Sequence, residues 1–247
     1  MTLPLYLADP EVVAAAVPGA ELRLDGPEGR HAATVRRTGP GERLLVGDAV
    51  GRVLTCGVLG VGRGALDLRV EEVRDVPAPD PRFVLVQALA KGDRDDQAIE
   101  AATEVGVDEV VPWQAARSIV QWRGDRGLKA WRKWDGVLLA ATKQSRRARR
   151  PGLASLATTA DVAARVAAAD AAYVLHGDAE SPLATVPLPD SGEVVLVVGP
   201  EGGIAPDELA TLVDAGGIPV RLGRTVLRSS SAGPAALAVL SAAGRWR

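Results

Sequence analysis

The chain has 247 residues, of which 47% are hydrophobic and 24% charged, so it encodes globular domains rather than a disordered segment. No apolar run reaches the roughly 18 residues of a membrane span, and the N-terminus lacks the basic flank of a signal peptide. One cysteine and two histidines make a disulfide and a metal site unexpected. We therefore expect a cytoplasmic protein without a bound metal.

The net charge of −2 hides a strongly basic segment. Between Gln114 and Arg150 the chain has eleven basic and two acidic residues, so this segment alone carries +9. The charged face of a solvated helix usually interleaves both signs, whereas segregation of this kind is typical of a surface that binds a polyanion. We therefore expect a nucleic-acid partner.

The first part of the chain has the pattern of a small β-domain. Short apolar segments between Gly and Pro turns predict strands at 3–7, 20–24, 42–47, 51–60 and 65–73. One helix is expected at about 28–38. The glycine-rich segment 60–64 precedes a strand rather than a helix, so we interpret it as a hairpin turn. Three prolines between Asp75 and Pro81 predict a linker.

Strands and helices alternate from Arg82 onward, which predicts a parallel sheet covered on both faces. The expected strands are 82–89, 109–113, 171–177, 193–200 and 218–223, and the expected helices are 95–105, 127–147, 159–169, 206–215 and 233–243. The helix at 159–169 is expected to take Thr158 or Thr159 as its N-cap.

The loops at three strand ends near the C-terminus are candidates for binding a small molecule. The segments Val198–Ile204, Leu222–Gly223 and Val226–Ala232 follow or adjoin predicted strands, and ligands bind beyond the carboxyl ends of parallel strands. The first lacks the Lys-Ser/Thr of a phosphate-binding loop. Ser229–Ser231 lacks a nucleophile-elbow context and is interpreted as loop and N-cap. His176, at another strand end, is interpreted as a core or loop residue.

Several motifs together resemble the RsmE family, which methylates N3 of a uridine in 16S ribosomal RNA. They are Gln87–Arg94, Ala102–Val107, Arg117–Val120, Lys143–Arg146 with Pro151, Gly199–Gly203, and Leu222-Gly223 with Val226–Arg228. They occur in the family's order over roughly residues 82–240. His31–Arg37 with Pro40–Glu42 resembles the family's first domain more loosely.

The resemblance implies an α/β fold with two domains. A PUA-like RNA-binding β-barrel is expected at 1–74, a Pro-rich linker at 75–81, and a SPOUT methyltransferase domain with a trefoil knot at 82–247. SPOUT enzymes act as homodimers and use S-adenosylmethionine. The expected substrate is therefore 16S ribosomal RNA of the small ribosomal subunit.

The resemblance also assigns roles to residues of this chain. It places cofactor binding at Val198, Gly199, Pro200, Glu201, Gly202, Gly203, Leu222, Gly223, Val226, Leu227, Arg228, Ser229, Ser231 and Ala232. We expect RNA contacts from Arg36, Arg37, Lys91, Arg94, Arg117, Lys143, Arg146, Arg147, Arg149 and Arg150. Arg94 and Arg228 adjoin predicted strand-end loops and are the candidate catalytic residues, acting on charge that develops on the target base.

The sequence departs from the family pattern in three places. Asp95 stands where the family usually has Met, Lys143 replaces a common Glu, and Ser229–Ser231 replaces Thr-Glu-Thr. The last change leaves position 230 without the family's carboxylate. Three alternatives remain open at this point: a SPOUT enzyme acting on another RNA, a non-catalytic RNA-binding protein, and a small-molecule α/β enzyme that leaves the basic segment unexplained.

Overall fold

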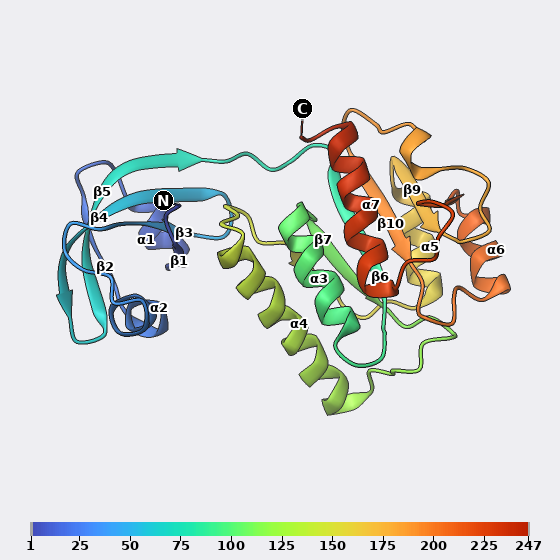
Figure 1. Cartoon of the computed structure of the whole chain (residues 1–247), viewed down its shortest axis with the longest axis horizontal. Coiled ribbons are helices and arrows are strands. Elements are labelled where there is room, and N and C mark those ends of the chain that lie inside the picture. Colours follow the sequence, from blue (N-terminus) through green and yellow to red (C-terminus); the bar gives the residue numbers. More distant parts are fainter. Residues whose placement is uncertain (1, 247) are drawn as a thin grey trace. The chain divides into compact units, whose positions relative to one another are not determined.

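The computed structural model describes residues 2–246 and divides the chain into two compact units (Figure 1). The N-terminal unit runs to Ala78 and also contains Thr142–Arg150. The C-terminal unit consists of Pro79–Ala141 and the chain from Pro151 onward. The segment Thr142–Arg150, which we had expected in the second domain, therefore packs with the first.

A five-stranded sheet forms the N-terminal unit. Its strands follow the order β1-β3-β4-β5-β2, with β1 parallel to β3 and the other neighbours antiparallel. Their bounds are β1 Leu5–Leu7, β2 Glu21–Leu24, β3 Arg43–Gly47, β4 Arg52–Gly62 and β5 Ala65–Asp75. The glycine-rich segment 60–64 lies at the β4–β5 hairpin turn, as predicted.

The helices of this unit differ from the prediction. The short helix α1 (Pro10–Ala15) was not predicted, although the Asp9 side chain accepts a hydrogen bond from the Glu11 amide and Pro10 occupies the first turn. The helix expected at 28–38 consists of α2 (Gly26–Arg30) continued by a π-helical turn over His31–Val35. The π-turn inserts extra backbone that side-chain periodicity does not reveal.

A six-stranded parallel sheet forms the centre of the C-terminal unit, in the order β11-β9-β10-β6-β7-β8. Its strands are β6 Arg82–Ala88, β7 Glu109–Trp113, β8 Gly152–Leu153, β9 Ala171–Leu175, β10 Glu193–Val198 and β11 Ile218–Val220. The predicted mixed α/β architecture with a parallel sheet is confirmed, and only the two-residue strand β8 was not predicted.

Five α-helices accompany this sheet. They are α3 Arg94–Val105, α4 Gly124–Gln144, α5 Thr159–Ala168, α6 Pro206–Asp214 and α7 Ser229–Ala243. Thr158 caps α5 through a capping box with Asp161, which confirms one of the two expected caps. The predicted start of α7 at 233 was wrong: Pro234 lies inside the helix, where burial of Pro234 and its neighbours offsets the missing backbone hydrogen bond.

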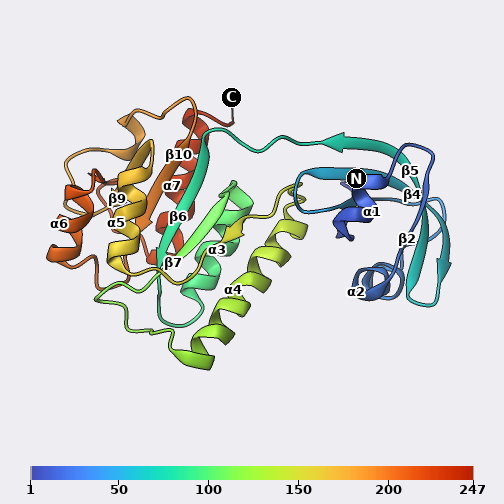
Figure 2. The same ribbon diagram turned by 180° about the vertical axis from the view of Figure 1, so that it is seen from behind.

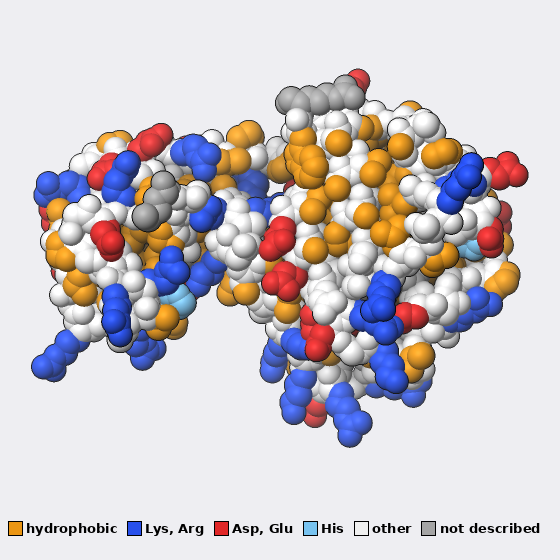
Figure 3. Space-filling model, in the orientation of Figure 1, with side chains coloured by type: hydrophobic (Ala, Val, Ile, Leu, Met, Phe, Trp, Pro, Cys, Tyr) orange, Lys and Arg blue, Asp and Glu red, His pale blue; other side chains and the backbone are white. Residues whose placement is uncertain are grey.

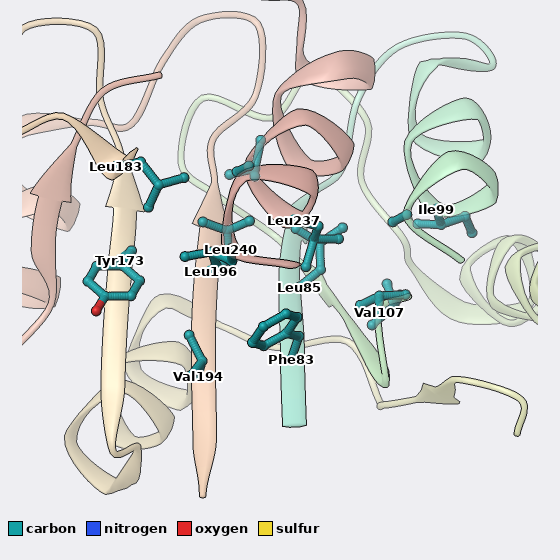
Figure 4. Close-up of a cluster of buried hydrophobic side chains, with 14 of the residues drawn as sticks. Phe83, Leu85, Ile99, Val107, Tyr173, Leu183, Val194, Leu196, Leu237 and Leu240 are labelled. Carbon is teal, nitrogen blue, oxygen red and sulfur yellow. The ribbon is translucent and has the colours of Figure 1, made fainter. Parts of the chain in front are cut away.

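The sheet is covered on both faces, as predicted. Phe83 and Leu85 of β6 pack with α3 and α7 on one face, while Val84 and Val86 pack with α5 and α6 on the other. Successive side chains of a strand point to opposite faces, so both faces of the apolar strands become core. Figure 4 shows the part of this core that α7 covers. In Figure 2, which views the molecule from the opposite side to Figure 1, α5 lies in front of the sheet. Among residues 2–246, no helix combines the length and apolar character needed to cross a bilayer.

A carboxyl group is buried at the start of α3. Asp95 is only 6% exposed, and its Oδ1 accepts a hydrogen bond of 2.9 Å from the Asp96 amide. Burial, together with the charge of Asp96, raises the pKa of Asp95 to about 6 from an ordinary value of 3.8. Between about pH 4 and 6 the native protein therefore holds a proton that the unfolded chain has lost.

We expect Asp95→Asn to stabilise the protein at pH 8, by up to about 3 kcal/mol, since one pKa unit corresponds to about 1.4 kcal/mol. A native pKa above the unfolded value makes the wild type lose stability as pH rises through this window, and Asn has no charge to bury. Urea unfolding at pH 8 and pH 4 measures the difference, which vanishes near pH 4. Asp190→Asn, at an exposed position, is the control. A variant no more stable than wild type at pH 8 contradicts the prediction.

Candidate cofactor cleft

A cleft of about 510 Å³ lies at the carboxyl ends of β9, β10 and β11 in the C-terminal unit. Because these strands are neighbours in a parallel sheet, the loops that leave them meet at one edge. The three segments singled out from the sequence, at Val198–Ile204, Leu222–Gly223 and Val226–Ala232, all contribute to its lining. The structure therefore brings together loops that are up to about thirty residues apart.

The loop after β10 makes a tight turn that requires glycine at two positions. The Gly203 amide donates to the Pro200 carbonyl at 2.8 Å, and Gly203 has a φ of +72°, a conformation that favours glycine. At Gly199 a Cβ would lie 2.7 Å from Cγ1 of Ile204 and 3.3 Å from the Ile204 amide nitrogen. The tight turn therefore excludes a side chain at Gly199 and disfavours one at Gly203, and both glycines line the cleft.

Glu201 is the charged residue of this turn, and it is held from outside the loop. Its Oε1 accepts hydrogen bonds from Nη1 of Arg94 at 2.9 Å and from the Lys91 amide at 3.2 Å. Burial raises the pKa of Glu201, but hydrogen bonds from its own amide, Arg94 and Lys91 outweigh burial and leave the pKa below its usual value. Glu201 is thus an anion bound to the β6–α3 loop.

The first turn of α7 forms another wall of the cleft. Arg228, in extended conformation, precedes the helix and makes no side-chain cap hydrogen bond. Ser229 is 7% exposed, and its Oγ has no hydrogen-bond partner among residues 2–246. A buried hydroxyl without a partner costs about 1–3 kcal/mol, which a polar ligand group would recover. Ser229 therefore points to a polar ligand in this cleft.

Most of the predicted cofactor residues line the cleft. They are Val198, Gly199, Pro200, Glu201, Gly203, Leu222, Gly223, Val226, Leu227, Arg228, Ser229 and Ala232. Gly202 and Ser231 belong to the same two segments but do not line it. Both candidate catalytic residues, Arg94 and Arg228, lie on its wall and are exposed.

Sequence reasoning missed the wall contributed by β9. Leu175, His176, Gly177 and Asp178 line the cleft, and the His176 amide donates to the Val220 carbonyl at 2.9 Å. The sequence did contain a usable signal, since His176 was placed at a strand end. What it did not reveal is that β9 lies between β10 and β11, which brings this strand end into the site.

The expected RNA-contacting residues fall into both units. Arg36 and Arg37 are exposed after the π-helical turn, and Arg146 is exposed in the segment that packs with the same unit. Two of the set are engaged within the N-terminal unit: Lys143 forms an ion pair with Glu28, and Nε of Arg149 donates to the Val76 carbonyl at 3.0 Å. Arg147 and Arg150 are half-buried in the same segment, while Lys91, Arg94 and Arg117 are exposed in the C-terminal unit.

The features of the cleft suit a small polar ligand, and S-adenosylmethionine is the ligand that the sequence resemblance leads us to expect. The volume of the cleft is in the range of small-molecule sites, its glycine turn allows close approach of backbone amides, and Ser229 supplies an unsatisfied hydroxyl. Within the described residues, no three His, Cys, Asp or Glu side chains are grouped so as to hold a metal ion.

Comparison with known proteins identifies the family. A family model described as an RNA methyltransferase domain matches residues 77–241, and one described as an RNA methyltransferase PUA domain matches residues 24–71. Ribosomal RNA small subunit methyltransferase E of Mycobacterium bovis is 48% identical over 233 residues, 92% of this chain and 89% of that protein. The chain belongs to the ribosomal RNA small subunit methyltransferase E family.

More distant members support the assignment. The Bacillus subtilis protein of the same name is 26% identical, over 88% of each chain. The structure of a putative methyltransferase from Legionella pneumophila in complex with S-adenosylmethionine superposes with a TM-score of 0.85 at 26% identity, over 99% of each chain. The predicted family is thereby confirmed.

Replacing a glycine that lines the cleft with a larger residue is expected to weaken the binding of S-adenosylmethionine. Gly223 lines the cleft, and a Cβ there meets no atom within 4 Å, so Gly223→Val adds bulk without a clash in the protein. We expect a Kd at least about tenfold higher by calorimetric titration, equivalent to about 1.4 kcal/mol. Gly203→Val is a poorer test, because its positive φ adds backbone strain.

Gly136→Val is the matched control for this substitution. Gly136 is exposed on α4, away from the cleft lining, and a Cβ there also meets no atom within 4 Å. This variant is expected to bind S-adenosylmethionine as the wild type does. A folded Gly223→Val protein with unchanged affinity would remove the β11 loop from the binding site.

Proposed function

We propose that this protein transfers a methyl group from S-adenosylmethionine to N3 of a uridine in 16S ribosomal RNA of the small ribosomal subunit. It is an S-adenosylmethionine-dependent ribosomal RNA methyltransferase, as its family membership establishes. The observation that carries the proposal is the nearly full-length similarity to the Mycobacterium bovis enzyme. The choice of a uridine as the target nucleotide, and of N3 as the target atom, comes from the family resemblance of the sequence motifs.

The cofactor is assigned to the cleft of the C-terminal unit. Backbone amides of the Gly199–Gly203 turn and of Leu222-Gly223 would contact it, and Ser229 Oγ would gain a hydrogen-bond partner. When bound, S-adenosylmethionine would supply an electrophilic methyl group, whose bond to the sulfonium sulfur breaks as the bond to N3 forms and leaves S-adenosylhomocysteine. The residues of the chain therefore position the reactants, which is how proximity accelerates such a transfer.

The acceptor atom N3 must be exposed and must lose its proton in the reaction. N3–H of uracil is a weak acid and is buried in base pairs, so the base must be unpaired or flipped out to react. Loss of its proton places negative charge on O2 and O4, which cationic donors stabilise. Arg94 and Arg228 are exposed on the cleft wall and are the catalytic residues of the proposal, donating hydrogen bonds to the developing charge.

Both units are assigned RNA contacts. In the N-terminal unit these come from the predicted set in Arg36–Arg37 and Lys143–Arg150, and in the C-terminal unit from Lys91, Arg94 and Arg117. The proposal includes a PUA-like barrel at 1–74, with which Thr142–Arg150 packs, a linker at 75–81, and a SPOUT domain with a trefoil knot in the remainder of 82–247. Phosphate contacts of this kind fix orientation, while the target base is recognised at the cleft.

A homodimer is part of the proposal. Figure 3 shows apolar side chains gathered over α7 in the C-terminal unit. Ala242 and Ala243 of this helix are exposed, and Trp246 beyond it is 60% exposed. An apolar surface of this kind on a folded domain favours burial against a partner, and we assign it to a second copy of the chain. We place the protein in the cytoplasm, with its ribosomal substrate.

Mass spectrometry of 16S ribosomal RNA tests the proposal. RNA from a strain that lacks this gene is expected to lose one N3-methyluridine, because the protein that we propose to introduce this methyl group is missing. The wild-type gene is expected to restore it, and so is the Gly136→Val gene, whereas Gly223→Val is expected to restore less. Ribosomal RNA with an unchanged set of methylated uridines in the deletion strain would contradict the proposed substrate.

A further inference from the structure

The turn after β10 is held on two sides by arginines from different loops. On one side, Nη1 of Arg94 donates to Oε1 of Glu201 at 2.9 Å. On the other, Nη1 of Arg117 donates to the Gly202 carbonyl at 3.0 Å. Arg94 follows β6 and Arg117 follows β7, so the turn is connected to both loops that come from the neighbouring half of the sheet.

Arg117 also packs against the backbone of this turn. A Cβ at Gly202 would lie 3.4 Å from Cβ and 3.7 Å from Cδ of Arg117, which is ordinary to tight van der Waals contact. Gly202 does not line the cleft, although it belongs to the segment predicted to bind the cofactor. Gly202 therefore lies against Arg117, whereas Gly199 and Gly203 line the cleft.

Both arginines keep donors available for another ligand. A guanidinium group carries five N–H donors in a planar fork, and each arginine uses only its Nη1 atom in hydrogen bonds within residues 2–246. Both side chains are exposed, and exposed Lys91 lies three residues before Arg94. Such a fork binds phosphate oxygens in a bidentate manner without giving up the existing hydrogen bond.

We propose that Arg94 and Arg117 couple RNA binding to cofactor binding through the Pro200–Gly203 turn. The inference rests on the proposed function and adds a regulation of the same site. RNA phosphates on the spare donors of the two arginines fix their side chains, and the fixed side chains hold the turn in the shape that lines the cleft. Arg117 is in this account a positioning residue, because it touches the turn and not the cofactor.

The direction of the coupling follows from ordering. A free long side chain and a free loop each lose conformational entropy when they are fixed. The ligand that binds first orders the shared turn, and part of its binding free energy offsets the entropy lost. The second ligand meets a turn that is already ordered, so it binds more tightly. The coupling is reciprocal by thermodynamic necessity, and RNA and cofactor therefore raise each other's affinity by the same factor.

Equilibrium dialysis with labelled S-adenosylhomocysteine tests the coupling without turnover. Its Kd is measured alone and with saturating small ribosomal subunits from a strain that lacks the gene. We expect the subunits to lower the Kd of the wild type by about fivefold or more, the usual range of such couplings. In Arg117→Ala this effect is expected to become clearly smaller, because one of the two links between RNA and the turn is lost while the hydrogen bond from Arg94 to Glu201 remains.

Two further variants separate positioning from charge. Arg117→Lys keeps the charge but replaces the planar fork with a compact ammonium group, so RNA binding is expected to survive better than the coupling. Arg123→Ala removes an exposed arginine of the same segment whose side chain forms no hydrogen bond or ion pair with the turn within residues 2–246. It is expected to weaken RNA binding while leaving the full coupling at saturation.

Each outcome bears on a different claim. A wild-type Kd that is the same with and without subunits, when both ligands bind, overturns the coupling and leaves the proposed function intact. Failure to bind S-adenosylhomocysteine at all overturns the proposed function and the coupling with it. If Arg117→Ala does not fold, the reciprocal measurement on the wild type decides: subunit affinity that does not rise with S-adenosylhomocysteine contradicts the inference.

Discussion

The constraint on which the C-terminal unit depends is the parallel pairing of its six strands. Parallel strands all end at the same edge, so the loops after β9, β10 and β11 must meet there. Both faces of the sheet are buried, because the continuous apolar side chains of β6 and β10 alternate between the two faces. The edge of the sheet therefore fixes the points at which the cleft loops begin. The glycine turn and the start of α7 then add what a polar ligand requires, namely close backbone approach and the unsatisfied hydroxyl of Ser229.

Sequence patterns predicted the sheet and most of the cleft because both depend on local signals. Continuous apolar strands, glycines at strand ends and the family motifs all lie within short segments. The order of the strands is not local, and therefore the wall formed by Leu175–Asp178 was missed. The start of α7 was placed four residues late, because Pro234 is a typical helix-start residue and its burial in the helix interior is a tertiary effect.

The basic segment between Gln114 and Arg150 is divided between the two compact units, which a count of charges does not show. Its last part, Thr142–Arg150, packs with the N-terminal unit, where Lys143 pairs with Glu28 and Arg149 bonds the Val76 carbonyl. These side chains contribute to the fold of that unit, so their loss would affect more than RNA affinity. Arg94 and Arg117 resemble them in that each donates a hydrogen bond to the Pro200–Gly203 turn and keeps other donors exposed. Counting charges predicted a polyanion partner, and the contacts distinguish which cations are available for it.

A crystal structure with S-adenosylhomocysteine would test the central claim most directly, namely that the cleft at the ends of β9, β10 and β11 is the cofactor site. The account predicts ligand density between the Gly199–Gly203 turn, Leu222-Gly223 and the first turn of α7, with a ligand atom within hydrogen-bond distance of Ser229 Oγ. Density at any other place on the chain, with this cleft empty at a saturating ligand concentration, would contradict it.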